Sequence, residues 1–121
     1  MATMTLTSEN FSKAVEDNEI VLVDFWAAWC GPCRSFAPVY EKAAERYADQ
    51  GIVFGKVDTD AEQALAAAAK ITSIPTLMAL KQGHVVFAQP GALPAAALDQ
   101  VIDAVLELDV EAALAGAAKE A

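Results

Sequence analysis

The stretch Trp29-Cys30-Gly31-Pro32-Cys33, with the apolar run Ile20-Val21-Leu22-Val23-Asp24-Phe25-Trp26 just before it, decides the fold of this chain. A nearly continuous run of apolar and β-branched residues is typical of a strand buried on both faces of a sheet. Pro32 suits the first turn of a helix, where its missing N–H is not needed. The sequence therefore predicts a buried strand leading into a helix that opens with the only two cysteines of the chain.

The spacing of the two cysteines favours a disulfide that forms and breaks reversibly. Residues three positions apart lie on one face of a helix with Cβ atoms about 5–6 Å apart, and a disulfide needs about 3.5–4.5 Å. Cys30 would lie at the helix N-terminus, where free N–H groups and the helix dipole lower the pKa of a thiol from about 8.5. We therefore expect Cys30 to be the attacking nucleophile and Cys33, more buried, to be the resolving thiol.

Two other interpretations of the cysteine pair are weaker. A zinc site needs four ligands, and the chain offers only His84 besides the two thiols, so such a site would have to be shared between chains. A purely structural disulfide would close so small a loop that it restricts the unfolded chain little. Redox chemistry is the favoured hypothesis, with no metal expected.

Length and composition limit the class of protein. A chain of 121 residues with 55% hydrophobic residues predicts one domain with one core. Its net charge of −9 disfavours nucleic acid and anionic membranes as partners. No segment approaches the ~18–20 apolar residues of a membrane span, and the first residues lack the pattern of a secretory signal. A catalytic cysteine pair without an export signal fits the reducing cytosol, so we expect a cytoplasmic protein.

Apolar segments alternate with amphipathic segments along the chain. We predict strands at residues 4–6, 20–27, 52–58, 75–80 and 84–89, and helices at 8–17, 31–49, 61–70 and from Pro94 onward. The order βαβαβαββα predicts an α/β fold with a central mixed sheet of about five strands flanked by about four helices. Thr7 or Ser8 is expected to cap the first helix. The acidic, Ala-rich tail either extends the last helix or frays.

The motifs of this chain, taken together and in order, resemble those of thioredoxins. They are Val23-Asp24-Phe25-Trp26-Ala27, Trp29-Cys30-Gly31-Pro32-Cys33, Pro38, Lys56-Val57-Asp58, Ser73-Ile74-Pro75-Thr76, Gly83 and Gly91-Ala92-Leu93. The match runs from about residue 5 to residue 108. We therefore expect a thioredoxin domain at residues 1–108, with the thioredoxin fold, and an acidic Ala-rich extension at 109–121.

The resemblance implies a protein-disulfide reductase that works by dithiol–disulfide exchange. It implies two kinds of partner, thioredoxin reductase and proteins with reducible disulfides. No cofactor is expected in the chain itself, because NADPH would be used indirectly through the reductase. The Gly31-Pro32 dipeptide implies a reducing potential, since oxidant relatives usually carry other residues there. A monomer is expected.

Two charged residues take roles from the resemblance. Asp24 interrupts an apolar strand, and burial raises the pKa of a carboxyl group. Such a group can accept the proton of Cys33, directly or through a water molecule. Lys56 corresponds to the family lysine that pairs with this aspartate and moderates the shift. The alternative is a buried ion pair with a structural role alone.

A docking surface around Cys30 also follows from the resemblance. Pro75 corresponds to the cis-proline that faces the cysteine pair in the family, which leaves the preceding backbone free to pair with an extended substrate segment. Trp29 is expected at the surface and Trp26 in the core. The residues expected on the docking surface are Trp29, Gly31, Pro32, Thr72, Ser73, Ile74, Gly91 and Ala92.

Some positions depart from the family pattern. Ala69 stands where thioredoxins usually carry an aromatic residue and Leu80 where they often carry Phe, so core volume is lost. Arg34 stands in place of a common Lys, and His84 is expected to be a bystander.

Two alternative functions stay open. A higher reduction potential would indicate an oxidase or isomerase of the same fold. Function that survives replacement of both cysteines by Ser would indicate a binding module that uses the surface around Trp29.

Overall fold

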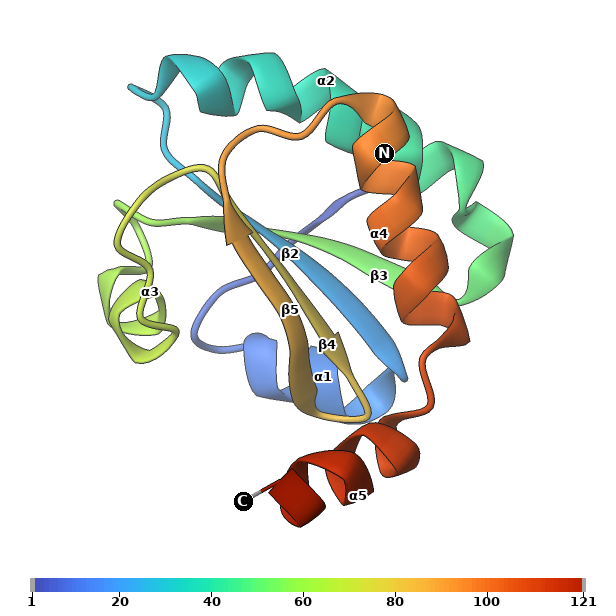
Figure 1. Ribbon diagram of the computed structural model, residues 1–121. Coiled ribbons are helices and arrows are strands. Elements are labelled where there is room, and N and C mark those ends of the chain that lie inside the picture. The colour runs from blue at the N-terminus through green and yellow to red at the C-terminus, as the bar shows by residue number, and fades with distance from the viewer. Residues whose placement is uncertain (1, 121) are drawn as a thin grey trace.

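The computed structural model of the chain describes residues 2–120. Its strands are β1 (Met4–Thr5), β2 (Ile20–Trp26), β3 (Ile52–Asp58), β4 (Thr76–Lys81) and β5 (His84–Pro90). Its α-helices are α1 (Phe11–Asp17), α2 (Gly31–Arg46), α3 (Gln63–Ala68), α4 (Ala95–Glu107) and α5 (Val110–Glu120), and a 3₁₀ turn spans Ala48–Gln50 (Figure 1). Within these residues, no helix is long and apolar enough to cross a membrane.

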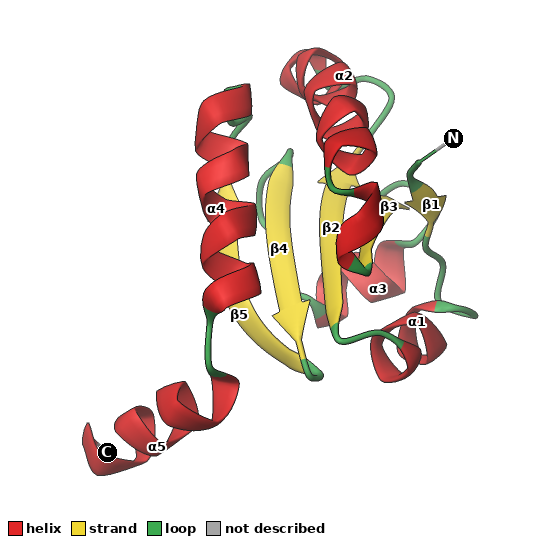
Figure 2. Ribbon diagram, turned by 90° about the vertical axis from the view of Figure 1, so that its right-hand side faces the viewer, coloured by secondary structure: helices red, strands yellow, loops and turns green. Residues whose placement is uncertain are grey.

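The five strands form one mixed sheet in the order β1-β3-β2-β4-β5. Strands β1, β3 and β2 are parallel, whereas β4 runs antiparallel to β2 and β5 antiparallel to β4. Helices α2 and α4 cover one face of the sheet, and α1 and α3 cover the other (Figures 1 and 2). The predicted α/β architecture is confirmed, with one helix more than the four expected.

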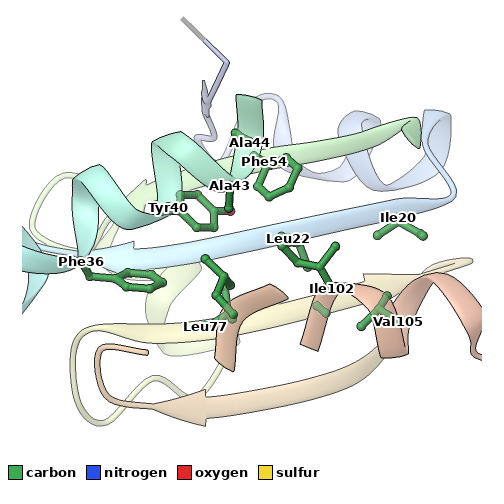
Figure 3. Close-up of a cluster of buried hydrophobic side chains, with 12 residues drawn as sticks. Ile20, Leu22, Phe36, Tyr40, Ala43, Ala44, Phe54, Leu77, Ile102 and Val105 are labelled. Carbon is green, nitrogen blue, oxygen red and sulfur yellow. The ribbon is translucent and has the colours of Figure 1, made fainter. Parts of the chain in front are cut away.

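Strand β2 lies at the centre of the sheet and contributes side chains to the core on both of its faces. Ile20 and Leu22 pack with Phe36 and Tyr40 of α2 and with residues of α4 (Figure 3). The alternate side chains Val21, Val23 and Phe25 pack on the opposite face with residues of α1 and α3. Because side chains alternate along a strand, Asp24 and Trp26 lie on the face covered by α2.

A close contact between α2 and β3 fixes the helix that carries the cysteines. The hydroxyl group of Tyr40 donates a 2.9 Å hydrogen bond to the backbone carbonyl of Gly55. A Cβ atom at Gly55 would overlap the side chain of Leu6, which packs directly on the backbone of β3. Glycine is therefore required at this point of the strand.

Several helix boundaries differ from the sequence-based expectation; α2, for example, ends at Arg46, three residues before the predicted end at 49. The regular helix α1 begins at Phe11, three residues later than expected. Thr7 nevertheless caps the turn that leads into it: its Oγ1 accepts a 3.3 Å hydrogen bond from the Glu9 N–H, and the Thr7 N–H donates a 2.7 Å hydrogen bond to Oδ1 of Asn10. This reciprocal pair of bonds is a capping box, and the Phe11 N–H donates to the carbonyl of Thr7 as in a helical turn. Helix α3 covers only Gln63–Ala68, because Lys70 adopts a positive φ of 60° that ends the helix.

The end of α4 is set by Lys81, which the sequence pattern placed in the hairpin turn. Lys81 is the last residue of β4, is only 5% exposed, and donates from Nζ to the carbonyls of Val105 (2.7 Å), Leu106 (3.0 Å) and Leu108 (2.8 Å). A cation at a helix C-terminus satisfies the free carbonyls and the negative end of the dipole. Helix α4 therefore stops at Glu107.

The tail forms a separate helix, so it neither extends α4 nor frays at its start. Oδ1 of Asp109 accepts a 3.0 Å hydrogen bond from the Ala112 N–H, as expected for a residue that caps the N-terminus of a helix. Val110 is buried, whereas Leu114 is largely exposed. Helix α5 is thus attached to the domain mainly at its first residues.

Candidate functional site

Cys30 and Cys33 are joined by a disulfide at the N-terminus of α2, with their Cα atoms 5.2 Å apart. Cys30 is the cap residue of the helix with extended backbone angles, and its Sγ accepts a 3.2 Å hydrogen bond from the Cys33 N–H. Both residues are buried, at 5% and 3% exposure, so Cys33 is scarcely more covered than Cys30 in the oxidised state. Sulfur thus occupies the position in which a helix stabilises negative charge.

The guanidinium group of Arg34 does not bind the sulfur atoms. Its Nη1 donates a 2.8 Å hydrogen bond to the carbonyl of Ala28. Arg34 therefore holds the loop between β2 and α2 closed and adds a positive charge close to the cysteines. Gly31 and Pro32, between the cysteines, are exposed.

The loop before β4 lies against the cysteine pair. The Ile74–Pro75 peptide bond is cis, as predicted, and the carbonyl oxygen of Ile74 lies 3.8 Å from the Sγ of Cys30. This is a packing contact, because a disulfide sulfur has no proton to donate. The N–H of Gly91 donates a 2.7 Å hydrogen bond to the carbonyl of Pro75, which ties the loop after β5 to the same place.

The segment before Pro75 offers two unpaired backbone N–H groups, whereas the carbonyl of Ser73 accepts a 2.6 Å hydrogen bond from the Thr76 hydroxyl. Thr72 and Ser73 are exposed and Ile74 is half-buried. Among the described residues, none accepts a hydrogen bond from the backbone N–H of Thr72 or Ile74. An extended peptide can pair with such a segment as an added strand.

Trp29 lies at the surface, as predicted, with 69% of it exposed. Its Nε1 donates a 3.0 Å hydrogen bond to Oδ2 of Asp60. The ring lines a groove of about 340 Å³ together with residues of α3 and of the segments before and after it, namely Thr59, Ala66, Ile71, Thr72, Ser73 and Ile74. The groove therefore joins Trp29 to the segment before Pro75.

Sequence reasoning missed Asp60, Thr59, Ala66 and Ile71. A signal was present for the first two, since they follow β3 at the edge of the sheet where the parallel strand β2 also ends. The loop is held by Oδ1 of Asp58, which accepts hydrogen bonds from the N–H groups of Asp60 (2.9 Å) and Ala61 (3.3 Å). Nothing in the local sequence marks Ala66.

Asp24 is completely buried on β2, and neither of its carboxylate oxygens has a hydrogen-bond partner among the described residues. Burial raises the pKa of this carboxyl group from 3.8 to about 6, while the positive charge of Lys56 opposes the shift. A carboxyl group with such a pKa can both accept and release a proton near neutral pH.

Lys56 does not form the expected ion pair with Asp24. The two residues are direct neighbours across β2 and β3, yet no Nζ–carboxylate contact within 4.0 Å joins these two described residues. The ammonium group of Lys56 lies instead 5.2 Å from the ring centroid of Trp26, which is half-buried and not a full core residue. Lys56 thus acts on Asp24 through space.

The cysteines, Ile74, Pro75 and Gly91 therefore form one contiguous site, and Trp29 with Thr72–Ile74 forms the groove beside it. Gly31, Pro32 and Ala92 are exposed around this centre. Within residues 2–120 there is no group of three or more His, Cys, Asp or Glu side chains that could hold a metal ion. A cysteine pair that forms a disulfide at a helix N-terminus of a mixed α/β sheet, beside an exposed groove, is the arrangement of a thiol–disulfide oxidoreductase.

Comparison with known proteins identifies the family. The family model for thioredoxin matches residues 2–104, and the chain belongs to the thioredoxin family. The chain is 59% identical over 110 residues to the putative thioredoxin 2 of Streptomyces coelicolor, which covers 91% of this chain and 81% of that protein. It is 44% identical over 106 residues to the thioredoxin of Alicyclobacillus acidocaldarius, covering 88% of this chain and all of that protein.

Solved structures agree with this assignment. A mutant thioredoxin from Halobacterium salinarum superposes with a TM-score of 0.79 at 34% identity, covering 88% of this chain and 93% of the other. Plasmodium falciparum thioredoxin gives a TM-score of 0.77 at 38% identity, covering 84% and 97%. The predicted thioredoxin fold and the predicted activity class, a protein-disulfide reductase, are confirmed by these relationships together with the cysteine pair.

Proposed function

We propose that Cys30 is the attacking thiolate and Cys33 the resolving thiol of a protein-disulfide reductase. The Cys30 thiolate attacks one sulfur of a substrate disulfide; a Cys30–substrate bond forms, and the second substrate sulfur leaves as a thiolate. Cys33, once deprotonated, attacks the Sγ of Cys30 and releases the first substrate sulfur. Two electrons pass to the substrate, and Cys30–Cys33 is left as a disulfide.

The 3.2 Å hydrogen bond from the Cys33 N–H to the Sγ of Cys30 carries this assignment. The same N–H and the positive end of α2 would stabilise a thiolate on Cys30 in the reduced protein, which lowers the pKa of a thiol. No equivalent donor comes from the helix to Cys33, which lies one turn further along α2. The first thiol to ionise is therefore Cys30.

Asp24 is proposed as the group that accepts the proton of Cys33, with Lys56 setting its proton affinity. The buried carboxyl group lies on the face of β2 that α2 covers, and its pKa of about 6 allows it to exchange protons near neutral pH. After the mixed disulfide resolves, the proton passes from Asp24 to the departing substrate thiolate or to water.

Docking is proposed at the surface around the cysteines. Trp29, Gly31, Pro32, Gly91 and Ala92 are exposed there and would exclude water from the mixed disulfide. The unpaired N–H groups of Thr72 and Ile74 would bind an extended substrate segment that lies along the groove beside Trp29.

We propose that thioredoxin reductase reduces the Cys30–Cys33 disulfide back to two thiols, with two electrons from NADPH. No cofactor within this chain takes part in the exchange. We propose that the protein works as a cytoplasmic monomer, with residues 1–108 as the catalytic domain and 109–121 as an extension.

Titration of the reduction potential tests the proposal. The fluorescence of Trp26 and Trp29 should report a single two-electron transition against a defined thiol buffer, at about −270 mV as for thioredoxin. A potential of about −180 to −120 mV would instead indicate an oxidase or isomerase. The absence of any transition would contradict the redox function.

Trapping variants test the two cysteine roles. With Cys33→Ser, an attack by Cys30 stops at the mixed disulfide, so a covalent complex with a substrate protein should accumulate. Cys30→Ser should trap none. Equal trapping by both variants would overturn the assignment, and a cellular function that survives replacement of both cysteines by Ser would indicate a binding module.

A further inference from the structure

We propose that Trp26 is a positioning residue, which holds the ammonium group of Lys56 over its indole ring and so keeps it out of an ion pair with Asp24. The inference deepens the proposed function, because it rests on Asp24 as the proton acceptor of Cys33.

The backbone alone would favour an ion pair between Asp24 and Lys56. They are register partners on adjacent parallel strands, so the two residues are direct cross-strand neighbours. Phe54, two residues before Lys56, and Leu22, two residues before Asp24, both belong to the core cluster beneath α2. Since side chains alternate along a strand, Asp24 and Lys56 lie on the same face of the sheet.

The ammonium group is nevertheless drawn away from the carboxyl group. Neither oxygen of Asp24 has a hydrogen-bond partner within the described part of the chain, and the Nζ of Lys56 lies 5.2 Å from the ring centroid of Trp26. That distance is within the ~6 Å range of cation–π attraction. Trp26 follows Asp24 by two residues on β2, so its ring lies on the same face and toward the end of the strand.

Solvation explains why the ammonium group of Lys56 lies at the ring of Trp26 and not at the carboxyl group of Asp24. Asp24 is fully buried, so an ammonium group in contact with it would lose its water. Trp26 is half-buried, and the ring attracts the cation at a place where water still reaches it. Trp26 therefore selects the half-solvated position of Lys56.

Few other titratable groups face Asp24 from the elements packed on it. Helix α2 contributes Tyr40, whose hydroxyl is bound to the carbonyl of Gly55, and Cys33 once the disulfide is reduced. The neighbour of Asp24 on β4 is the apolar Leu77. Lys56 is therefore the positive charge that lowers the proton affinity of Asp24. Trp26 fixes the position of that charge relative to the carboxyl group.

The test is a titration of the Asp24 carboxyl carbon by NMR on the oxidised protein, in which no cysteine titrates. Trp26→Leu should move the midpoint down, because the freed ammonium group approaches the carboxylate. Trp26→Phe, which keeps an aromatic face, should leave the midpoint close to that of the wild type. In the Lys56→Met background, Trp26→Leu should produce no shift.

Each other result overturns the proposal. An upward shift in Trp26→Leu would mean that the ring holds Lys56 close to Asp24. A downward shift that persists with Lys56→Met would mean that Trp26 only shields Asp24 from water. An unchanged midpoint in Trp26→Leu would mean that the ring does not position Lys56.

A measurement on the wild-type protein tests the proposal even if the Trp26→Leu variant does not fold. The ε-methylene protons of Lys56 should be shifted upfield by the ring current of Trp26; unshifted resonances would overturn the proposal without any variant. Failure of the proposed function gives a different signature, since Asp24→Asn would then leave the rate of the resolving step unchanged whatever the NMR titration shows.

Discussion

The N–H of Gly91 donates a 2.7 Å hydrogen bond to the carbonyl of Pro75, and Gly91 does so with a φ of 105°. The bond connects the loop after β5 to the loop that lies against Cys30. A residue with a side chain is strained at this φ, so the bond depends on glycine.

Gly91→Ala should therefore lower both stability and activity. We expect a loss of about 1–2 kcal/mol in the free energy of unfolding, and a higher KM for protein disulfides because the Pro75 loop shifts. Gly83→Ala is the matched control: Gly83 also has a positive φ, of 80°, but lies in the β4–β5 hairpin turn. Urea titration and insulin reduction measure the two effects. Equal KM changes in both variants would contradict a role of the Gly91 bond in docking.

Asp24→Asn should stabilise the oxidised protein at neutral pH and leave it unchanged in acid. The folded pKa of about 6 lies above the usual 3.8, so the folded state binds the proton more tightly and stability falls as pH rises from about 4 to above 6. A shift of this size corresponds to about 3 kcal/mol at pH 8. Urea titrations of both proteins at pH 3.5 and pH 8 measure the difference. A gap that does not widen with pH would contradict the raised pKa.

Lys81→Met should destabilise the fold without changing the reduction potential. It removes the ammonium group that binds three carbonyls at the end of α4, a loss of about 2–4 kcal/mol. The control is Lys13→Met, because Lys13 pairs with Asp17 in an exposed salt bridge whose contribution is small. Thermal unfolding compares the two variants. Comparable losses of stability would show that the buried contacts of Lys81 are not decisive.

Leu80→Phe should raise the stability of the protein. Leu80, Met78 and Ala69 line an apolar hollow of about 260 Å³ together with Phe11, Leu65, Ala68, Lys70 and Val85, at the place where a larger family side chain was expected. Filling such a space commonly adds about 0.5–2 kcal/mol. Val23→Phe, at a fully buried position of the same cluster, should instead overpack and destabilise. A lower urea midpoint for Leu80→Phe would show that the hollow cannot accept the ring.

The sequence predicted the strand β2, the helix with the cysteines and the cis peptide bond at Pro75 because each has a local or motif-level signal. The apolar run fixes β2, Pro32 starts α2, and the thioredoxin motifs place Pro75 opposite Cys30. The docking roles of Thr72–Ile74, Gly91 and Ala92 stay predictions, supported by their positions in the structure.

The remaining features depend on partners distant in the sequence. Lys81 finds its carbonyls more than twenty residues later, so its position beside the hairpin turn suggested only a turn residue. The ammonium group of Lys56 lies near the ring of Trp26 and not near Asp24. The alternation of side chains along β2 and β3 places all three residues on one face, so it does not predict which of the two Lys56 contacts. Thr7 caps the turn before α1, but the regular helix begins only at Phe11, three residues after the expected start.

The position of Lys81 also indicates where a label or a second domain can be attached to the protein. Lys81 pairs with Ile20, the first residue of β2, whereas the cysteines follow the last residue of that strand. Since α5 is joined to the domain beside Lys81, it projects from the end of the sheet remote from the disulfide (Figure 1). A label, a surface or a second domain joined to α5 would leave the approach to Cys30 open. The oxidoreductase can thus be tethered through α5 without blocking the access of substrate proteins to the cysteine pair.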